Sequence, residues 1–348
     1  MNGGNQTDQT DHEKKKRVFG RIDFLGIITF TVGFVCLMLA VLWGGGRYEW
    51  KTPQVIGLYC GFVVLFPLYV YIDLYVAPEP MIPILRLIRL RNYVLSFIIN
   101  IMAGGCLYGI TLFYPIYFQV VIGDHAFDAG MRLLPFMLAV CVAAAVSGWI
   151  VSKYGEYRVQ IWIGLALATT GTGLTLIWTT ESPPYLFTLA PIISGTGYGM
   201  VFLTTFTSAQ SQLTINQDSD TPENEKNSDG GRSSGSGVYV DDLAAGTALI
   251  DFCRTIGGVL STSILTSALN NSAIALIGDR PDHDQLISAI RKGIGAIIDD
   301  LEWGQQLAVL DAYVYGSFMV RLVLTAASGL AFILSLGMKN VPLKDHKK

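Results

Sequence analysis

Long uncharged apolar runs, each about the length of a membrane-spanning helix, recur along the chain and are separated by polar segments. A bilayer core about 30 Å thick requires about 20 mostly apolar helical residues. Eight such runs occur, at residues 22–43, 54–76, 94–114, 133–151, 159–178, 186–208, 248–268 and 313–336. They are continuous rather than alternating, which favours helices over a β-barrel, because backbone groups in lipid must pair within the segment. The pattern predicts an all-α membrane protein with about eight transmembrane helices.

The composition agrees with a surface that lipid covers. Hydrophobic residues make up 51% of the 348 residues and charged residues only 15%, whereas an ordinary soluble domain carries about 25% charged residues. A formal net charge of −3 gives no indication of a nucleic-acid partner. The five cysteines and four histidines show no paired or ligand-like spacing. We therefore expect no metal site, no cofactor and no enzymatic activity.

The distribution of basic residues predicts how the chain crosses the bilayer, because Lys and Arg collect on cytoplasmic loops. When the loops between the eight runs are taken alternately, sixteen of the 24 Lys and Arg residues lie on one side and five on the other. The remaining three, Arg132, Arg254 and Arg321, lie inside or at the edge of runs. The basic side includes both chain ends, so residues 1–21 and 338–348 are predicted to be cytoplasmic tails. This agrees with an even number of spans.

Two longer polar segments interrupt the apolar pattern. Residues 213–242 are rich in Gly, Ser and charged residues and predict a disordered cytoplasmic loop, with a phosphorylated regulatory loop as the alternative. Residues 271–311 are predicted to form an extracellular loop. Its isoleucines recur with helical spacing, at Ile287, Ile290, Ile294 and Ile297. This spacing fits a short helix that lies on the membrane surface, or one that packs on the neighbouring spans.

Charged residues inside apolar runs are candidates for function, because a charge in lipid is costly. Arg321 lies about nine residues into the last run with apolar neighbours on both sides, so it must face the bundle interior or a water-filled cavity. A substrate or coupling role and a structural role are both open. Arg254 follows Asp251 by one helical turn, which places the two on one face. Gating or coupling and simple anchoring are both compatible with this pair.

Several uncharged polar residues extend the set of candidates. Asn100, Tyr108, Tyr114 and Gln119 lie on or just past the third run and could hydrogen-bond a ligand in a cavity, or could bond between helices. Asn270 begins an Asn-Asn-Ser sequon on the predicted outer side, close to a span, and is a weak glycosylation candidate.

Glycine pairs with four-residue spacing predict close helix contacts. Gly105 with Gly109 and Gly195 with Gly199 have this spacing, which lets two helices approach closely. No glycine-rich stretch follows a strand or ends in Gly-Lys-Ser/Thr, so nucleotide binding is not expected.

Six motif regions follow one another along the chain. They are DFLG at 23–26, WGGGRYEW at 43–50, YPIYFQVVIG at 114–123 with AGMRLLP at 129–135, KYGEYR at 153–158, SGTGYGM at 194–200 and DFCRTIGG at 251–258. In this order, from about residue 20 to 337, the chain resembles the fourteen-helix drug:proton antiporters of fungi, a branch of the major facilitator superfamily.

The resemblance implies a secondary transporter that exports drugs, toxins or secondary metabolites in exchange for protons. It assigns residues 22–92 to two linker helices and a basic cytoplasmic loop, and residues 93–337 to the six-helix carboxy-terminal half, so that the amino-terminal half is missing. The partners it implies are the lipid bilayer, a small-molecule substrate, protons and a second transporter half. The plasma membrane is the expected location, with the vacuolar membrane as the alternative.

Two other functions remain open on the sequence. One is a non-transporting or half-transporter remnant with a regulatory role, which the missing half suggests. The other is a transporter of siderophores or amino acids from a related branch of the superfamily, which would move its substrate inward.

Overall fold

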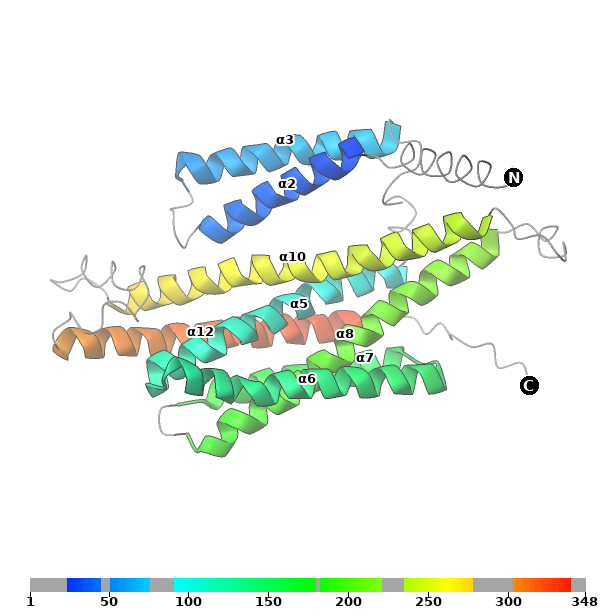
Figure 1. The fold of residues 1–348 in the computed structure, drawn as a ribbon. Helices are drawn as coiled ribbons and strands as arrows, with labels where there is room; N and C mark the ends of the chain where they lie inside the picture. The colour runs from blue at the N-terminus through cyan, green and yellow to red at the C-terminus, as the bar shows by residue number, and fades with distance from the viewer. Residues whose placement is uncertain are drawn as a thin grey trace, which may run out of the picture.

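The computed structural model describes residues 24–44, 51–75, 91–179, 182–220, 235–277 and 303–338. The helices in these ranges run antiparallel to their neighbours along the chain (Figure 1). They are α2 (Phe24–Trp43), α3 (Pro53–Tyr75), α5 (Arg91–Tyr117), the π-helix η1 (Phe118–Ile122), α6 (Ala126–Tyr154), α7 (Arg158–Leu174), the 3-10 helix η2 (Thr175–Ile177), α8 (Pro184–Asp220), α10 (Gly235–Ile277) and α12 (Trp303–Ser335).

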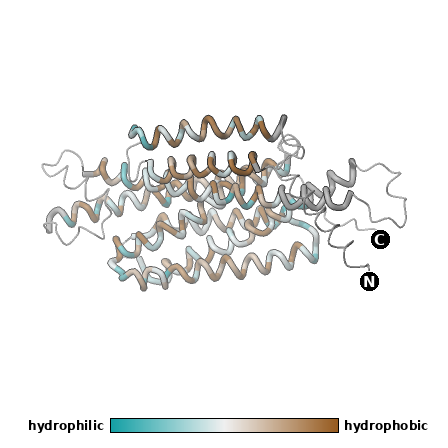
Figure 2. The backbone as a smooth tube through the Cα atoms, turned by 45° about the horizontal axis from the view of Figure 1, so that its top comes forward, coloured by the Kyte–Doolittle hydropathy of each residue, from teal (hydrophilic) through white to brown (hydrophobic). Residues whose placement is uncertain are grey.

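Eight helices in the described part of the chain are long and apolar enough to cross a membrane, which confirms the predicted all-α membrane fold. Apolar colour continues along most of each helix and around it, with polar positions gathered near the helix ends (Figure 2). Large apolar side chains such as Val64, Leu138 and Ile333 are more than half exposed. Helices that are apolar on all faces are typical of a bundle that lipid surrounds.

The helices extend further than the apolar runs that predict them. α6 begins at Ala126 rather than at residue 133, and α12 begins at Trp303 rather than at residue 313. Polar and charged residues occupy these extra turns, so a rule based on uninterrupted apolar residues misses them. A helix does not have to end where its apolar run ends, because its ends lie at the polar surface of the bilayer.

The two predicted loops are shorter in the structure than the sequence suggests. α8 continues to Asp220 and α10 begins at Gly235, so both ends of the predicted disordered loop 213–242 are helical. The ends of the predicted extracellular loop 271–311 are likewise helical, because α10 continues to Ile277 and α12 begins at Trp303. Residues 221–234 and 278–302 lie outside the described residues, as do the predicted surface helix at Ile287–Ile297 and both predicted tails apart from Met338.

Six helices form one bundle, and the α2–α3 hairpin packs on it along α10 (Figure 1). Phe252 of α10 contacts Phe30 and Phe34 of α2, with ring centroids 5.3 and 4.7 Å apart. The hydroxyl of Ser263 on α10 donates a hydrogen bond to the backbone carbonyl of Val41 near the other end of α2. The hairpin is therefore held by aromatic packing along the first half of α2 and by a polar contact near its carboxy-terminal end.

Glycines bring α5 and α10 into backbone contact. A Cβ added to Gly105 would lie 3.1 Å from the carbonyl oxygen of Gly257, and one added to Gly109 would lie 2.6 Å from a methyl of Leu265. Gly257 itself faces the backbone of Ile101 so closely that a Cβ would overlap the Ile101 carbonyl. The predicted role of Gly105 and Gly109 is confirmed. A larger residue at Gly105 or Gly257 would meet the backbone of the other helix and push the two helices apart, whereas at Gly109 it would first displace leucine side chains.

α8 uses glycines in the same way on two of its faces. Gly195 and Gly199 face α6, where added Cβ atoms would meet the backbone carbonyls of Phe136 and Val140. Gly197 faces α7 and would meet the backbone of Ala168. The prediction for Gly195 and Gly199 is therefore confirmed, and α8 is the helix against which both α6 and α7 pack.

We predict that Gly257→Ala lowers the free energy of unfolding by about 1–3 kcal/mol, the usual cost of overpacking. The added methyl would collide with the Ile101 carbonyl, which belongs to the helix backbone and cannot rotate away. The measurement is denaturant unfolding of the purified chain in an uncharged detergent, followed by circular dichroism.

Gly130→Ala is the matched control, because Gly130 lies in α6 and nothing approaches its Cβ position within 4 Å. Alanine is the better helix former there, so this variant is expected to be as stable as the wild type or more so. Equal stability of the two variants would show that the α5–α10 contact is looser than described.

Candidate functional site

Arg321 lies in the interior of the bundle, about midway along α12, and is only 4% exposed. Its guanidinium carbon is 4.6 Å from the ring centroid of Tyr117 and 5.8 Å from that of Trp178. The structure describes no ion pair for this arginine. A buried guanidinium over the faces of aromatic rings gains cation–π attraction in place of a counter-charge. Arg321 therefore faces the bundle interior, as the sequence suggests, and it also borders a small internal cavity.

Polar hydrogens without partners surround this arginine. Nε and Nη1 of Arg321, the hydroxyls of Tyr114 and Tyr117, and the indole nitrogen of Trp178 are all buried and make no well-formed hydrogen bond to a described residue. Arg321 nevertheless lies within donating reach of the Tyr117 oxygen, and Thr175 within donating reach of the Tyr114 oxygen. The three rings pack together, with Tyr114 and Tyr117 5.0 and 5.6 Å from Trp178. We call Arg321, Tyr114, Tyr117 and Trp178 the arginine cage.

A small cavity lies beside the arginine cage, between α5, α10 and α12. Its volume is about 20 Å³, and Tyr114, Tyr117 and Arg321 line it together with apolar residues such as Phe113 and Leu269. This volume holds about one water molecule. The cage therefore faces a space for one small polar guest, not for a whole drug-sized molecule.

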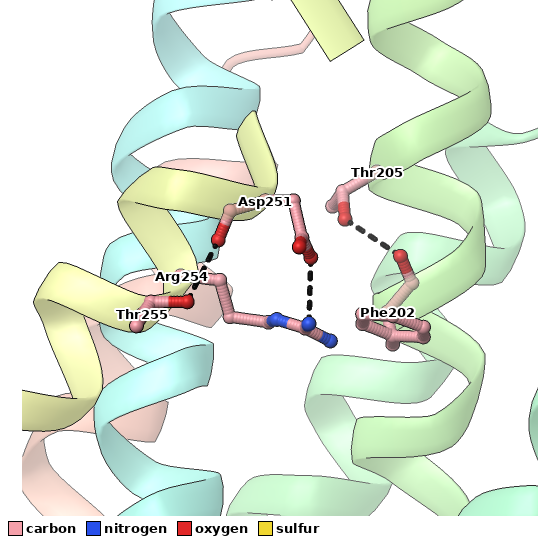
Figure 3. Close-up of polar contacts among 5 residues, drawn as sticks. All are labelled: Phe202, Thr205, Asp251, Arg254 and Thr255. Carbon is pink, nitrogen blue, oxygen red and sulfur yellow. Dashed lines mark hydrogen bonds and ion pairs between the residues drawn. The ribbon is translucent and has the colours of Figure 1, made fainter. Parts of the chain in front are cut away.

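A second charged feature lies where α10 faces α8 (Figure 3). Nη2 of Arg254 is 2.6 Å from Oδ1 of Asp251, and the guanidinium carbon is 4.0 Å from the ring centroid of Phe202 on α8. The Asp251 side chain is 54% exposed and that of Arg254 is 21% exposed. We call Asp251, Arg254 and Phe202 the α10 pair site.

The position of Arg254 depends on a glycine of α5. A Cβ on Gly104 would lie 2.6 Å from Cγ of Arg254 and would also overlap the Arg254 carbonyl. The arginine stem therefore passes over Gly104 on one side and places its guanidinium on Phe202 on the other. The expected Asp251–Arg254 pairing on one helix face is present, and α5 and α8 hold it from both sides.

The structure separates the remaining candidates. Asn100 is buried and donates a hydrogen bond to the carbonyl of Ser96 within its own helix, 3.1 Å away. Tyr108 is 43% exposed and its ring covers Gly258, one turn beyond Arg254. Gln119 is exposed on the π-helix η1. The Asn100 side chain thus bonds to the backbone of its own helix, whereas Tyr108 lies next to the α10 pair site.

The sequon at Asn270 falls inside α10, which continues to Ile277. Asn270 is partly buried and belongs to the apolar span of that helix. Sequons that are modified lie in exposed loops, so this placement gives the glycosylation candidate no support.

Sequence reasoning named Tyr114 but missed the other aromatic members of the two sites, Tyr117, Trp178 and Phe202. Tyr117 follows Tyr114 by three residues on α5, so a search for neighbours on the Tyr114 face would have found it. Trp178 directly follows η2 and Phe202 lies on α8, and nothing in their local sequence points to an arginine far along the chain. Within the described residues, no group of three His, Cys, Asp or Glu side chains is placed to hold a metal ion.

The architecture and these sites define an integral membrane protein built on a polytopic helical bundle. The family model of the major facilitator superfamily matches residues 8–231 of the chain. The chain belongs to this superfamily.

Relatives with assigned names agree with this placement. The chain is 25% identical over 332 residues to the MFS-type efflux pump MFS1 of Arthroderma benhamiae. This alignment covers 94% of this chain and 56% of that protein. It is 28% identical over 320 residues to the probable efflux pump gsfJ of Penicillium aethiopicum, covering 92% of the chain and 53% of the relative. The dehydrocurvularin exporter of Alternaria cinerariae is 24% identical over 333 residues, with 96% and 53% covered. The chain therefore spans about half the length of these curated relatives.

We predict that a double-mutant cycle of Asp251→Asn and Arg254→Gln gives a coupling energy of at most about 1 kcal/mol. Ion pairs whose carboxylate remains exposed contribute little to stability, and Asp251 is more than half exposed. The free energies of unfolding of the two single variants, the double variant and the wild type provide the measurement. A coupling of several kcal/mol would mean that the pair is shielded from solvent in the folded protein.

Proposed function

We propose that this chain is the carboxy-terminal part of an efflux transporter, which exports small organic molecules in exchange for protons. The relatives described above carry names of efflux pumps and exporters, and this chain aligns with them over nearly all of its length. One observation supports the proposal further: the α10 pair site places a carboxylate that other side chains only half cover, and an arginine, within a membrane-length helix of an otherwise apolar bundle. Charges inside membrane spans are characteristic of ion and substrate pathways.

Asp251 is the proton-binding group in this proposal. As a carboxylate it holds Nη2 of Arg254 at 2.6 Å. Protonation removes the negative charge and weakens this pair, so Arg254 then keeps only its cation–π contact with Phe202 of α8. Because the two partners of Arg254 belong to different helices, the protonation state of Asp251 changes how strongly α10 is tied to α8.

The branch architecture fits the same proposal. The α2–α3 hairpin corresponds to the two linker helices of a fourteen-helix transporter, and α5 to α12 correspond to the six helices of its carboxy-terminal half. Both termini are then cytoplasmic, and the plasma membrane is the location we propose.

A second transporter half is the proposed partner, and an apolar groove between α6 and α8 offers a surface for it. The groove has a volume of about 640 Å³ and is lined by residues that include Leu138, Val142, Ile192 and Thr196. The chain spans about half the length of its relatives, so a partner of similar size would restore the full length. In a preparation of this chain alone, the partner is a second copy.

The transport proposal is tested by reconstituting the full chain in liposomes with an imposed pH gradient and following ethidium fluorescence. We expect ethidium movement that depends on the gradient, and an at least tenfold slower gradient-driven rate for Asp251→Asn. Exchange of ethidium without a gradient is expected to survive in this variant, because only the proton-binding group has been removed.

Asp128→Asn is the matched control, since Asp128 is an exposed carboxylate in the first turn of α6, outside the α10 pair site. Unchanged gradient dependence in Asp251→Asn would refute its coupling role. No ethidium movement above empty liposomes would favour the non-transporting alternative, and gradient-driven accumulation in the uptake direction would favour a siderophore or amino-acid transporter.

The partner proposal predicts a dimer of the purified chain by native mass spectrometry and by chemical cross-linking. Val142→Arg, which places a charge at the groove, is expected to shift the protein to monomer. Val63→Arg on α3 is the matched control, because Val63 and Val142 are similarly exposed, at 64% and 62%. A wild-type chain that is monomeric under all conditions would contradict pairing of copies.

A further inference from the structure

The arginine cage holds a buried positive charge that no described carboxylate neutralises. Arg321 is 4% exposed, and the titratable groups that interact with it electrostatically are Tyr114 and Tyr117. Tyrosines carry no negative charge near neutral pH, so neither is a counter-ion. Buried charges in proteins are normally paired, because an isolated charge in an apolar interior is strongly unfavourable. The cation–π contacts with Tyr117 and Trp178 offset only part of this cost.

The unpartnered atoms around this charge are hydrogen-bond donors. The guanidinium nitrogens of Arg321 and the indole nitrogen of Trp178 can only donate, and a tyrosine hydroxyl donates through its proton. No well-formed hydrogen bond joins these groups to a described residue. Where Arg321 approaches the Tyr117 oxygen and Thr175 approaches the Tyr114 oxygen, the tyrosine is the acceptor, so both hydroxyl protons remain able to donate to a guest. A site that combines several donors with a positive charge selects a guest that accepts hydrogen bonds and is negatively charged.

The cavity sets the size of this guest. Arg321, Tyr114 and Tyr117 come from α12 and α5 and line the same space of about 20 Å³, whose other walls are largely apolar. One water-sized group fills such a space. A drug-sized molecule does not fit, whereas a monatomic anion or a single carboxylate group reaching into the cavity does.

We propose that the arginine cage is a binding site for a small anion, with Arg321 supplying the charge and Tyr114 and Tyr117 supplying further hydrogen bonds. The guest is a chloride ion or a carboxylate group of a transported molecule, which share the required chemistry. The site lies in the core of the six-helix bundle and does not include Asp251 or Arg254. A test of anion binding at the arginine cage is therefore independent of a test of proton coupling at Asp251.

The test measures binding of radioactive chloride to the purified full-length chain in an uncharged detergent and a zwitterionic buffer that contains neither halide nor carboxylate, so that no buffer anion competes for the cavity. A parallel titration uses radioactive acetate as the carboxylate probe. We expect one saturable anion per chain in at least one titration. Binding of chloride identifies a free anion as the guest, and binding of acetate alone identifies a carboxylate group.

Variants decide whether the bound anion lies in the cage. Arg321→Met is expected to weaken binding at least tenfold, and Tyr117→Phe, which keeps the ring but removes one donor, is expected to weaken it several-fold. Arg158→Gln is the matched control, because Arg158 also stacks on an aromatic ring, 4.2 Å from the centroid of Trp162, at the opposite end of α7. It is expected to bind like the wild type.

Two results would overturn the proposal. One is the absence of saturable chloride and acetate binding to a wild-type chain that elutes as a single folded species. The other is wild-type affinity in Tyr117→Phe together with either wild-type affinity or misfolding in Arg321→Met, since the site would then not include the cage donors.

Discussion

The close approach of helix backbones is the constraint on which the rest of this structure depends. In lipid, the hydrophobic effect does not drive one apolar helix against another, so tight packing and polar contacts must do so. Gly257 lies against the backbone of Ile101, and Gly197 against that of Ala168. These contacts draw α10 onto α5 and α8 onto α7, and α8 also draws in α6 through Gly195. The positions of the functional side chains follow from these distances, because Gly104 leaves the space through which Arg254 reaches Phe202.

Both intramembrane arginines are placed on aromatic rings, but they differ in how solvent reaches them. Arg254 has a carboxylate partner that other side chains of the bundle leave about half uncovered. Arg321 is buried with unpartnered donors next to a cavity of about one water molecule. The first arrangement suits a group that changes its charge state during a cycle. The second suits a fixed charge that holds a small guest.

The sequence predicted the eight membrane-length helices found among the described residues, because the length of an apolar run reflects the thickness of the bilayer. It predicted the glycine contacts for the same kind of reason, since four-residue spacing places two glycines on one helix face. Helix ends were predicted less well. α6, α10 and α12 extend through polar residues into segments that were expected to be loops. Hydropathy does not show where a helix ends once the chain leaves the apolar core of the bilayer.

The sequence by itself determined which charges lie within the membrane helices and that Asp251 and Arg254 share one helix face, because these properties depend only on local spacing. The tertiary structure alone decided what surrounds each charge. Tyr117 on α5 and Trp178 just after η2 together enclose Arg321 on α12, and Phe202 reaches Arg254 from α8. Contacts of this kind join residues far apart in the chain. They depend on how far apart the helices lie and how each is rotated about its axis, and the sequence of one helix alone does not determine either.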